Sequence, residues 1–368
     1  MSTTRKLTGP VDCLLAIPEM LGYEPAESLV ILPLAERRGR AILRVDLPPP
    51  ACEPGLFAEA MLGHLARLRD CTRIVIAVFT NLSLEVGPMP AREPVLALID
   101  AAQSAGIEVV DAVCRGGDAW AQYVGPLGGS RWGLRCASEH APAANFHEFA
   151  QIVPRSRRAR TAFAKQLAQL GDGTIPSDEE ALEAWRDLLD VAAADGEDEL
   201  PAVALTTARI TVTAALRSMR LSELLLAEAA FGADAAVDLS LVWNALLDDF
   251  EASAIDGVLS DRAEFEPIDL DRTAIAILAL RDLIALIPDA DGANALAALS
   301  WLEWVRGGTS LAEHYSALAL ALDADQLLGG VVHWLVTNAI LPGWFGAVGC
   351  EGGFRDEDFD ALLEGRRS

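Results

Sequence analysis

The hydrophobic positions of the first 140 residues form short runs that alternate with segments of helical spacing. An apolar run at 28–34 is bounded by turn residues, and the run at 73–79 is typical of a strand covered on both faces. Helical spacing follows at 53–69 and at 92–105, and a further strand pattern lies at 107–113. The strand–helix–strand order of 73–113 requires a crossover connection.

Turn residues separate these elements. The segment "ERRGR" reverses the chain after the first run, and "AILRVDLPPP" reads as a second strand that three prolines end. The glycine pairs in "CRGGDAWAQYV" and "GPLGGSRWGLRC" indicate hairpins. The first part of the chain therefore predicts a mixed sheet with helices packed on it.

From about residue 145 the pattern is helical and strand signals almost vanish. The predicted helices are 156–170, 177–194, 201–217, 219–231, 235–252, 271–286, 292–306, 310–322 and 325–340. Ser177 stands three residues before Glu180, which is the spacing of a capping box. We predict an α+β, or mixed α/β, protein: an N-terminal mixed β-sheet domain with flanking helices at 1–145, and an all-helical acidic domain at 146–368.

Charge is distributed unevenly between these two parts. The net charge is -25, yet residues 1–170 carry 18 Lys and Arg against 17 Asp and Glu, whereas the remainder carries 11 against 37. So acidic a surface repels phosphates, which makes nucleic acid an unlikely partner and argues against binding to an anionic membrane. It favours a basic protein partner or simply solubility.

Cysteine usage and the N-terminus bear on the cellular compartment. The six cysteines are scattered without a CxxC pair, which suits a reducing cytosol better than a disulfide framework. "MSTTRKLTGPVDC" lacks the apolar core of a signal peptide. The stretch 326–349 has the length of a membrane span, but His333, Asn338 and Pro342 interrupt it, so we expect a buried helix followed by a turn. The prediction is a cytoplasmic protein without a membrane segment.

The segment "LGYEPAESLVILPL" places a polar cluster directly before a strand. Gly22 can end the preceding helix, Pro25 fixes a turn, and Ser28 can bond local backbone. Glu24 and Glu27 are expected to face water. Because turn chemistry accounts for every polar residue, we favour a turn over a catalytic loop.

Three segments also resemble a known family. "LLAIPEMLGYEPAESLVILPL" followed by "RVDLP" resembles the N-terminal signature of a large actinobacterial family of uncharacterised proteins, known only as a domain of unknown function. "SRWGLRC" resembles a later segment of that family, and the acidic helical stretch ending in "LPGWF" resembles its C-terminal part. The resemblance implies a cytoplasmic protein of bacteria with GC-rich genomes and supplies no activity.

Charged and polar residues near strand ends form the strongest candidate site. In "RVDLP", Arg44 and Asp46 lie on one face of a strand, and Thr80 and Asn81 directly follow another strand. Ligands of open α/β sheets bind at the carboxyl ends of strands, so these residues and the Gly116-Gly117 turn could line one crevice. The alternative is an ion pair that holds a strand end, and we favour it because such pairs are common.

Arg131 and Trp132 could close this crevice. They lie in "GPLGGSRWG", which is glycine-rich, but a phosphate-binding loop requires a helix after it and "RWGLRC" reads as a strand. A hairpin is therefore the better interpretation. Cys136, His140 and His147 fit no zinc spacing, so we expect no metal, and no cofactor motif is present.

The segment "PRSRRAR" has four arginines, at 155, 157, 158 and 160. It could contact a phosphate group, but a helix start paired with the acidic domain is the favoured interpretation. No catalytic constellation is visible in the sequence. Our leading hypothesis is a non-enzymatic binding or scaffold protein that uses its helical surface for a protein partner or for self-association. The alternative is a small-molecule enzyme or ligand sensor with its site at the strand ends.

Overall fold

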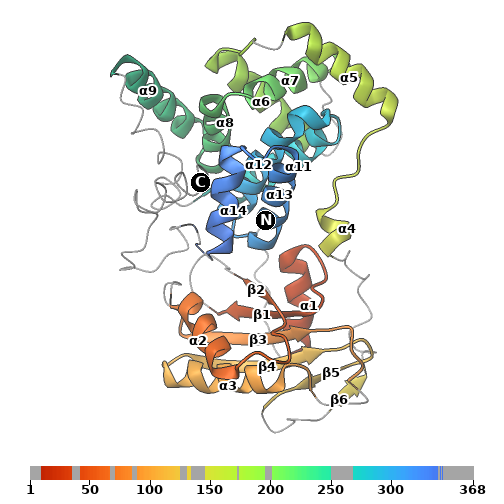
Figure 1. The fold of residues 1–368 in the computed structure, drawn as a ribbon, viewed down its shortest axis with the longest axis vertical. Helices are drawn as coiled ribbons and strands as arrows, with labels where there is room; N and C mark the ends of the chain where they lie inside the picture. The colour runs from red at the N-terminus through yellow and green to blue at the C-terminus, as the bar shows by residue number, and fades with distance from the viewer. Residues whose placement is uncertain are drawn as a thin grey trace. The chain divides into compact units, whose positions relative to one another are not determined.

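A computed structural model shows the fold (Figure 1). The residues it describes are 10–34, 42–66, 71–84, 89–124, 131–133, 146–171, 174–194, 201–249, 268–338, 340 and 342. Backbone packing divides the chain into two units that separate between Gln151 and Ile152. The sheet lies in the first unit and most helices lie in the second, which confirms the predicted fold class. The domain boundary at 145/146 stays a prediction, because it concerns parts that fold independently.

A six-stranded sheet forms the first unit, in the order β2-β1-β3-β4-β5-β6. Its strands are β1 (Ser28–Pro33), β2 (Leu43–Asp46), β3 (Arg73–Phe79), β4 (Glu108–Arg115), β5 (Ala119–Gln122) and β6 (Arg131–Gly133). Strands β3 and β4 are parallel and all other neighbours are antiparallel. The crossover between the parallel strands contains α3 (Arg92–Ser104), and the remaining helices are α1 (Pro10–Leu21), α2 (Pro54–Leu65) and α4 (Phe146–Ala150).

Helices cover both faces of this sheet, as the apolar run of β3 predicts. On one face Leu29 and Ile76 pack in a cluster with Leu98 of α3 and residues of α2. On the other face Val30 and Phe79 pack against α1. Because successive residues of a strand point to opposite faces, a strand buried on both must be apolar at nearly every position.

Helix α4, which the sequence analysis does not predict, packs onto the turn after α1. Phe146 and Phe149 place their ring centroids 5.1 and 5.7 Å from that of Tyr23. Gly22 ends α1 with φ +82, and an added Cβ would lie 2.9 Å from Cζ of Phe149. Both the backbone conformation and this close approach require glycine there, so the predicted end of the first helix is confirmed.

All regular secondary structure among the described residues of the second unit is α-helical. Its helices are α5 (Arg157–Leu170), α6 (Asp178–Ala193), α7 (Ala202–Ala215), α8 (Met219–Phe231), α9 (Ala233–Asp249), α11 (Leu270–Ile284), α12 (Asp289–Val305), α13 (Thr309–Leu322) and α14 (Leu327–Thr337). The capping box of Ser177 and Glu180 is present. Trp185, Trp301 and Tyr315 are among the largest fully buried side chains.

Helix α14 confirms the helical part of the stretch 326–349, with Val332 and Leu335 buried. Most of the turn predicted after it lies outside the described residues. None of the described helices has the combination of length and apolarity that crossing a membrane requires.

A carboxylate is buried among these helices. Glu303 of α12 is 1% exposed and accepts a hydrogen bond from Nε of Arg306 at 2.5 Å. Burial raises the pKa of Glu303, while the positive charges of Arg306 and Arg281 act in the opposite direction. Arg281 also donates to the hydroxyl of Tyr315, whose pKa burial raises to about 12. Tyr315 is therefore neutral at physiological pH.

The raised pKa of Glu303 predicts the direction of a pH dependence. The folded state binds this proton more tightly than the unfolded chain does, so Glu303 stabilises the fold most below its ordinary pKa of 4.5, and this stabilisation decreases as pH rises through the raised folded value. We expect the free energy of unfolding of the wild type, measured with urea, to fall between pH 4 and pH 8 relative to that of Glu303→Gln. Glu313→Gln on exposed α13 surface is the control, and parallel curves for wild type and Glu303→Gln would refute the prediction.

The turn between β4 and β5 predicts a second effect on stability. An added Cβ at Gly116 would lie 2.5 Å from Cγ of Leu84 and 2.7 Å from the carbonyl oxygen of Leu82. We expect Gly116→Ala to lower the free energy of unfolding by about 1–3 kcal/mol, because packed backbone must move. Gly63 of α2 has no atom within 4 Å of its added Cβ, so Gly63→Ala should raise stability by about 0.5–1 kcal/mol. Urea denaturation of both variants measures the contrast, and equal shifts would contradict it.

Candidate functional site

The predicted strand-edge residues do lie along one edge of the sheet. The register pairs Asp46 with Ser28, Ser28 with Phe79, and Phe79 with Arg115. The carboxyl ends of β2, β3 and β4 therefore meet at the start of β1. Thr80 and Asn81 directly follow β3 at this edge, as expected, and Thr80 N donates to the carbonyl oxygen of Arg115 at 3.0 Å.

The charged side chains at this edge bind one another. Nη2 of Arg44 lies 2.7 Å from Oδ1 of Asp46, and its Nε donates to Oγ of Ser28 at 2.9 Å. The Asp46 side chain is 81% exposed. This geometry is that of the strand-end ion pair left open as the alternative. A ligand role for Arg44 and Asp46 stays a prediction.

Arg131 and Trp132 do not lie beside that ion pair. Trp132 of β6 pairs with Trp120 of β5, three strands from β3 and five from β2. At the usual spacing between neighbouring strands these separations are about 14 and 24 Å. To close a crevice over Asp46, as predicted, these two residues would have to reach across most of the sheet.

The turn before β1 connects the strand ends, which the sequence analysis missed. Oε1 of Glu27 accepts hydrogen bonds from the hydroxyl of Thr80 at 2.9 Å and from the amide of Asn81 at 2.8 Å. The Glu24 carboxylate pairs with Arg115 at the end of β4. We had expected Glu24 to face water, and this prediction was wrong, because its side chain is only 25% exposed. Burial raises the pKa of Glu24, although the positive charge of Arg115 acts in the opposite direction.

The turn that follows α1 thus fastens three strands at one edge. Leu47 N, just after β2, donates to the carbonyl oxygen of Glu27 at 2.9 Å. Each polar side chain of this turn has a structural partner, which agrees with the turn interpretation over the catalytic loop. Glu24 and Arg115 are 91 residues apart, so no local pattern predicts their ion pair. The only signal for this turn in the sequence was the density of polar residues before the strand.

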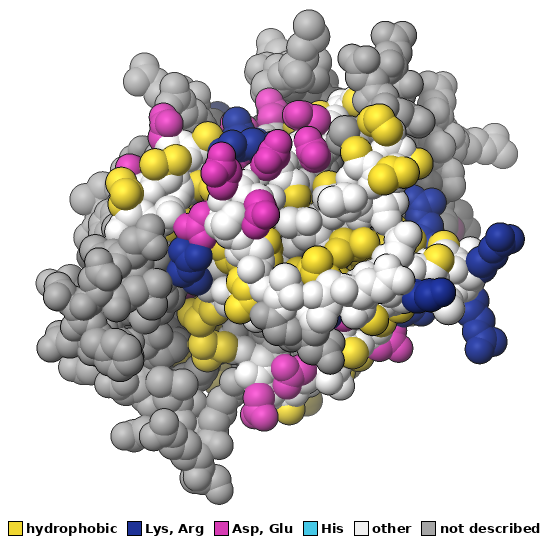
Figure 2. All heavy atoms as spheres, turned by 90° about the horizontal axis from the view of Figure 1, so that it is seen from above, with side chains coloured by type: hydrophobic (Ala, Val, Ile, Leu, Met, Phe, Trp, Pro, Cys, Tyr) yellow, Lys and Arg dark blue, Asp and Glu magenta, His cyan; other side chains and the backbone are white. Residues whose placement is uncertain are grey.

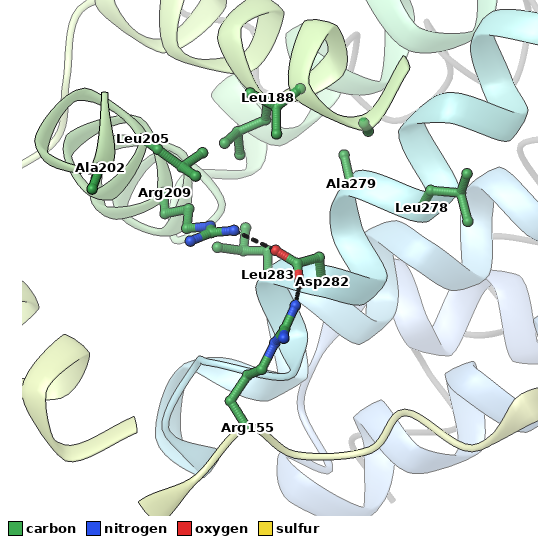
Figure 3. Close-up of a pocket in the computed structure, with 11 residues that line it drawn as sticks. Arg155, Leu188, Ala202, Leu205, Arg209, Leu278, Ala279, Asp282 and Leu283 are labelled. Atoms are coloured by element: carbon green, nitrogen blue, oxygen red, sulfur yellow. Dashed lines mark hydrogen bonds and ion pairs between the residues drawn. The ribbon is translucent and has the colours of Figure 1, made fainter. Parts of the chain in front are cut away.

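A cavity in the helical unit is the better candidate for binding. Its volume is about 490 Å³, which is within the range of small-molecule sites. Residues of the segment before α5 and of α6, α7 and α11 line it: Arg155, Leu188, Val191, Ala192, Ala202, Leu205, Arg209, Leu278, Ala279, Asp282 and Leu283. Eight of these eleven side chains are apolar, and the three polar ones converge (Figure 3).

Asp282 holds two arginines at this cavity. Its Oδ2 accepts from Nη2 of Arg209 at 2.5 Å, and its Oδ1 accepts from Nη2 of Arg155 (Figure 3). A main-chain hydrogen bond also holds Arg155 beside α11, because Arg155 N donates to the carbonyl oxygen of Ala285 at 2.8 Å. The side-chain hydrogen bond to Asp282 raises the pKa of Arg155, so the guanidinium stays charged. Three segments distant in the sequence thereby meet in one polar cluster.

The arginine-rich segment forms ion pairs with acids of the helical unit, as the favoured interpretation predicts. Arg155 pairs with Asp282, and Nη2 of Arg160 lies 2.6 Å from Oδ1 of Asp289. Arg157 and Arg158 are exposed. Seen from above, acidic side chains gather beside hydrophobic ones, and basic side chains project at one side (Figure 2).

A second cavity, of about 250 Å³, lies nearer α12 and α14, with Trp301 and Leu328 among its lining residues. Its polar groups bind other described residues. Nε of Arg217 lies 2.7 Å from Oδ1 of Asp291, and the side chain of Gln326 caps α14 and contacts Asn294.

In the part of the chain that the structure describes, no group of three His, Cys, Asp or Glu side chains is placed to hold an ion. His147 lies on α4, whereas Cys136 and His140 lie outside the described residues.

A comparison with protein-family models places the chain in one family. The family described as Domain of unknown function (DUF4192) matches residues 10–342. The chain belongs to this family. The match covers the sheet edge, the turn that fastens it and the cavity of the helical unit. No curated protein and no solved structure matches the chain significantly.

The hydrogen bonds of Glu27 predict a measurable contribution to stability. Glu27→Ala removes the acceptor for the Thr80 hydroxyl and the Asn81 amide, which should lower the free energy of unfolding by about 1–2 kcal/mol. Glu59→Ala, on the exposed face of α2, is the control and should be near neutral. In a double-mutant cycle with Thr80→Val, the two effects should couple by about 1 kcal/mol. Strictly additive effects would show that the bond contributes nothing.

Proposed function

We propose that this protein is a non-enzymatic binding protein whose helical unit carries the site, in the cavity between α6, α7 and α11. The observation that carries the proposal is the combination of an apolar cavity of about 490 Å³ with three converging polar groups. Apolar walls with a few placed polar groups are typical of sites for small molecules. At the sheet edge, by contrast, Arg44 and Asp46 bind each other and Glu27 satisfies Thr80 and Asn81.

A neutral probe tests whether the cavity binds at all. Nile red is apolar and uncharged, so its fluorescence should report saturable binding of one molecule to the full chain. Ala192 lines the cavity and its neighbour Ala193 on α6 is exposed and does not. We expect Ala192→Trp to weaken binding at least tenfold, because the indole fills the cavity, and Ala193→Trp to leave it unchanged. Equal binding by both variants, or no saturable binding, would reject the proposed function.

Contact with another protein is the second candidate function, and exposed apolar side chains on α9 favour it. Val237 and Leu241 lie one turn apart and are 52% and 63% exposed. Burying such a pair against a second copy of the chain would remove apolar surface from water. This candidate retains the self-association predicted from the sequence.

Light scattering during size-exclusion chromatography measures that association. If α9 forms the contact, the wild-type mass should exceed that of one chain, and Leu241→Glu should reduce it to a monomer. Leu270→Glu, an exposed leucine at the start of α11, is the control and should keep the wild-type mass. A monomeric wild type at high micromolar concentration would contradict self-association.

A further inference from the structure

The polar end of the helical cavity has an excess of positive charge. Asp282 forms ion pairs with both Arg155 and Arg209, so two guanidinium groups share one carboxylate. Other ion pairs of this unit, among the residues described, also join an arginine to an acid: Arg160 with Asp289, Arg186 with Glu228, Arg217 with Asp291, Arg220 with Asp178, Arg272 with Asp269 and Arg306 with Glu303. The formal charge of the cavity lining is therefore +1, whereas residues 152–368, which contain the whole helical unit, have 16 Lys and Arg against 37 Asp and Glu, a net charge of -21.

Both guanidinium groups keep hydrogen-bonding capacity. A guanidinium has five N–H donors, and the ion pairs with Asp282 use only Nη2 of each arginine. Arg209 is the better placed of the two, because its side chain is 21% exposed whereas that of Arg155 is 58% exposed. A carboxylate can accept two parallel hydrogen bonds from one guanidinium, a geometry that an ammonium or a hydroxyl cannot reproduce.

The apolar walls determine the rest of the ligand. Leu188, Leu205 and Leu283 face the cavity from three helices, together with smaller side chains such as Ala279. Each methylene that moves from water to such walls adds favourable binding free energy. A ligand that matches both ends has an apolar body and a single negative charge.

We infer that the helical cavity binds a small organic acid, with its carboxylate on Arg209 and Arg155 and its apolar body between α6, α7 and α11. Asp282 forms an ion pair with both guanidinium groups and lowers their combined charge to that of one cation. A monoanion neutralises this cation, whereas a dianion or a cation leaves charge uncompensated. The inference rests on the proposed function, since it names the ligand class of the same cavity.

Three probes with the same ten-carbon chain test whether the cavity prefers acids, apart from whether it binds ligands at all. Decanoate, decanol and decylamine differ only in the polar end. Calorimetric titration of the full chain should show decanoate binding at least tenfold more tightly than decanol, and decylamine more weakly than both. If decanol and decanoate bind equally while Nile red binding is sensitive to Ala192→Trp, the cavity binds ligands but not by recognising acids. Tightest binding of decylamine, or no binding of decanoate at millimolar concentration, also overturns the inference.

Two variants of the polar cluster should change affinity in opposite directions. Arg209→Met removes the better-placed guanidinium and should weaken decanoate at least tenfold, to the level of decanol, without changing decanol. Asp282→Asn removes the competing negative charge and should tighten decanoate several-fold. General damage to the fold would weaken both complexes, so opposite effects distinguish charge recognition from misfolding. Arg157→Met, on exposed α5 surface, is the control and should bind decanoate as the wild type does. Weaker decanoate binding by Asp282→Asn would overturn the inference.

Discussion

Ion pairs between helices are the interaction on which the acidic second unit depends. After residue 170 the sequence has 11 Lys and Arg for 37 Asp and Glu, so cations are scarce. The structure uses them between elements: Arg186 joins α6 to α8, and Arg209 joins α7 to α11. The pair of Arg186 with Glu228 is the clearest case, because the Glu228 side chain is 1% exposed and accepts two hydrogen bonds, at 2.6 and 3.2 Å. A carboxylate so buried requires a cation.

The sheet unit solves a related problem with a turn. The carboxyl ends of β2, β3 and β4 meet at one edge of the sheet. There the guanidinium of Arg115 and the amide of Asn81 need hydrogen-bond acceptors. Glu24 and Glu27 supply them from the turn before β1. The polar residues of the turn before β1 therefore help to assemble the sheet, and their hydrogen bonds and ion pairs account for the density of polar side chains in this segment.

Local patterns predicted the elements well and the site poorly, for a physical reason. Strand alternation, helical spacing, the glycine pair at 116 and 117, and the capping box of Ser177 depend on neighbours in sequence. The partners of ion pairs depend on tertiary packing instead: Arg155 and Asp282 are 127 residues apart, and Arg209 and Asp282 are 73 apart. No periodicity links them. Composition also suggested that Arg131 and Trp132 lie near Asp46; β6 is five strands from β2 in the sheet, and a ligand role for these two residues stays a prediction.

The elements of each unit are joined by ion pairs, and the helical unit has a cavity where two arginines share an acid. The most direct measurement of that account is a crystal structure of the full chain with 10-bromodecanoate, located by the anomalous signal of bromine. The account predicts a bromine peak among the leucines of the cavity, with carboxylate density on the guanidinium of Arg209. An ordered bromine elsewhere, with the cavity filled only by water, would contradict it.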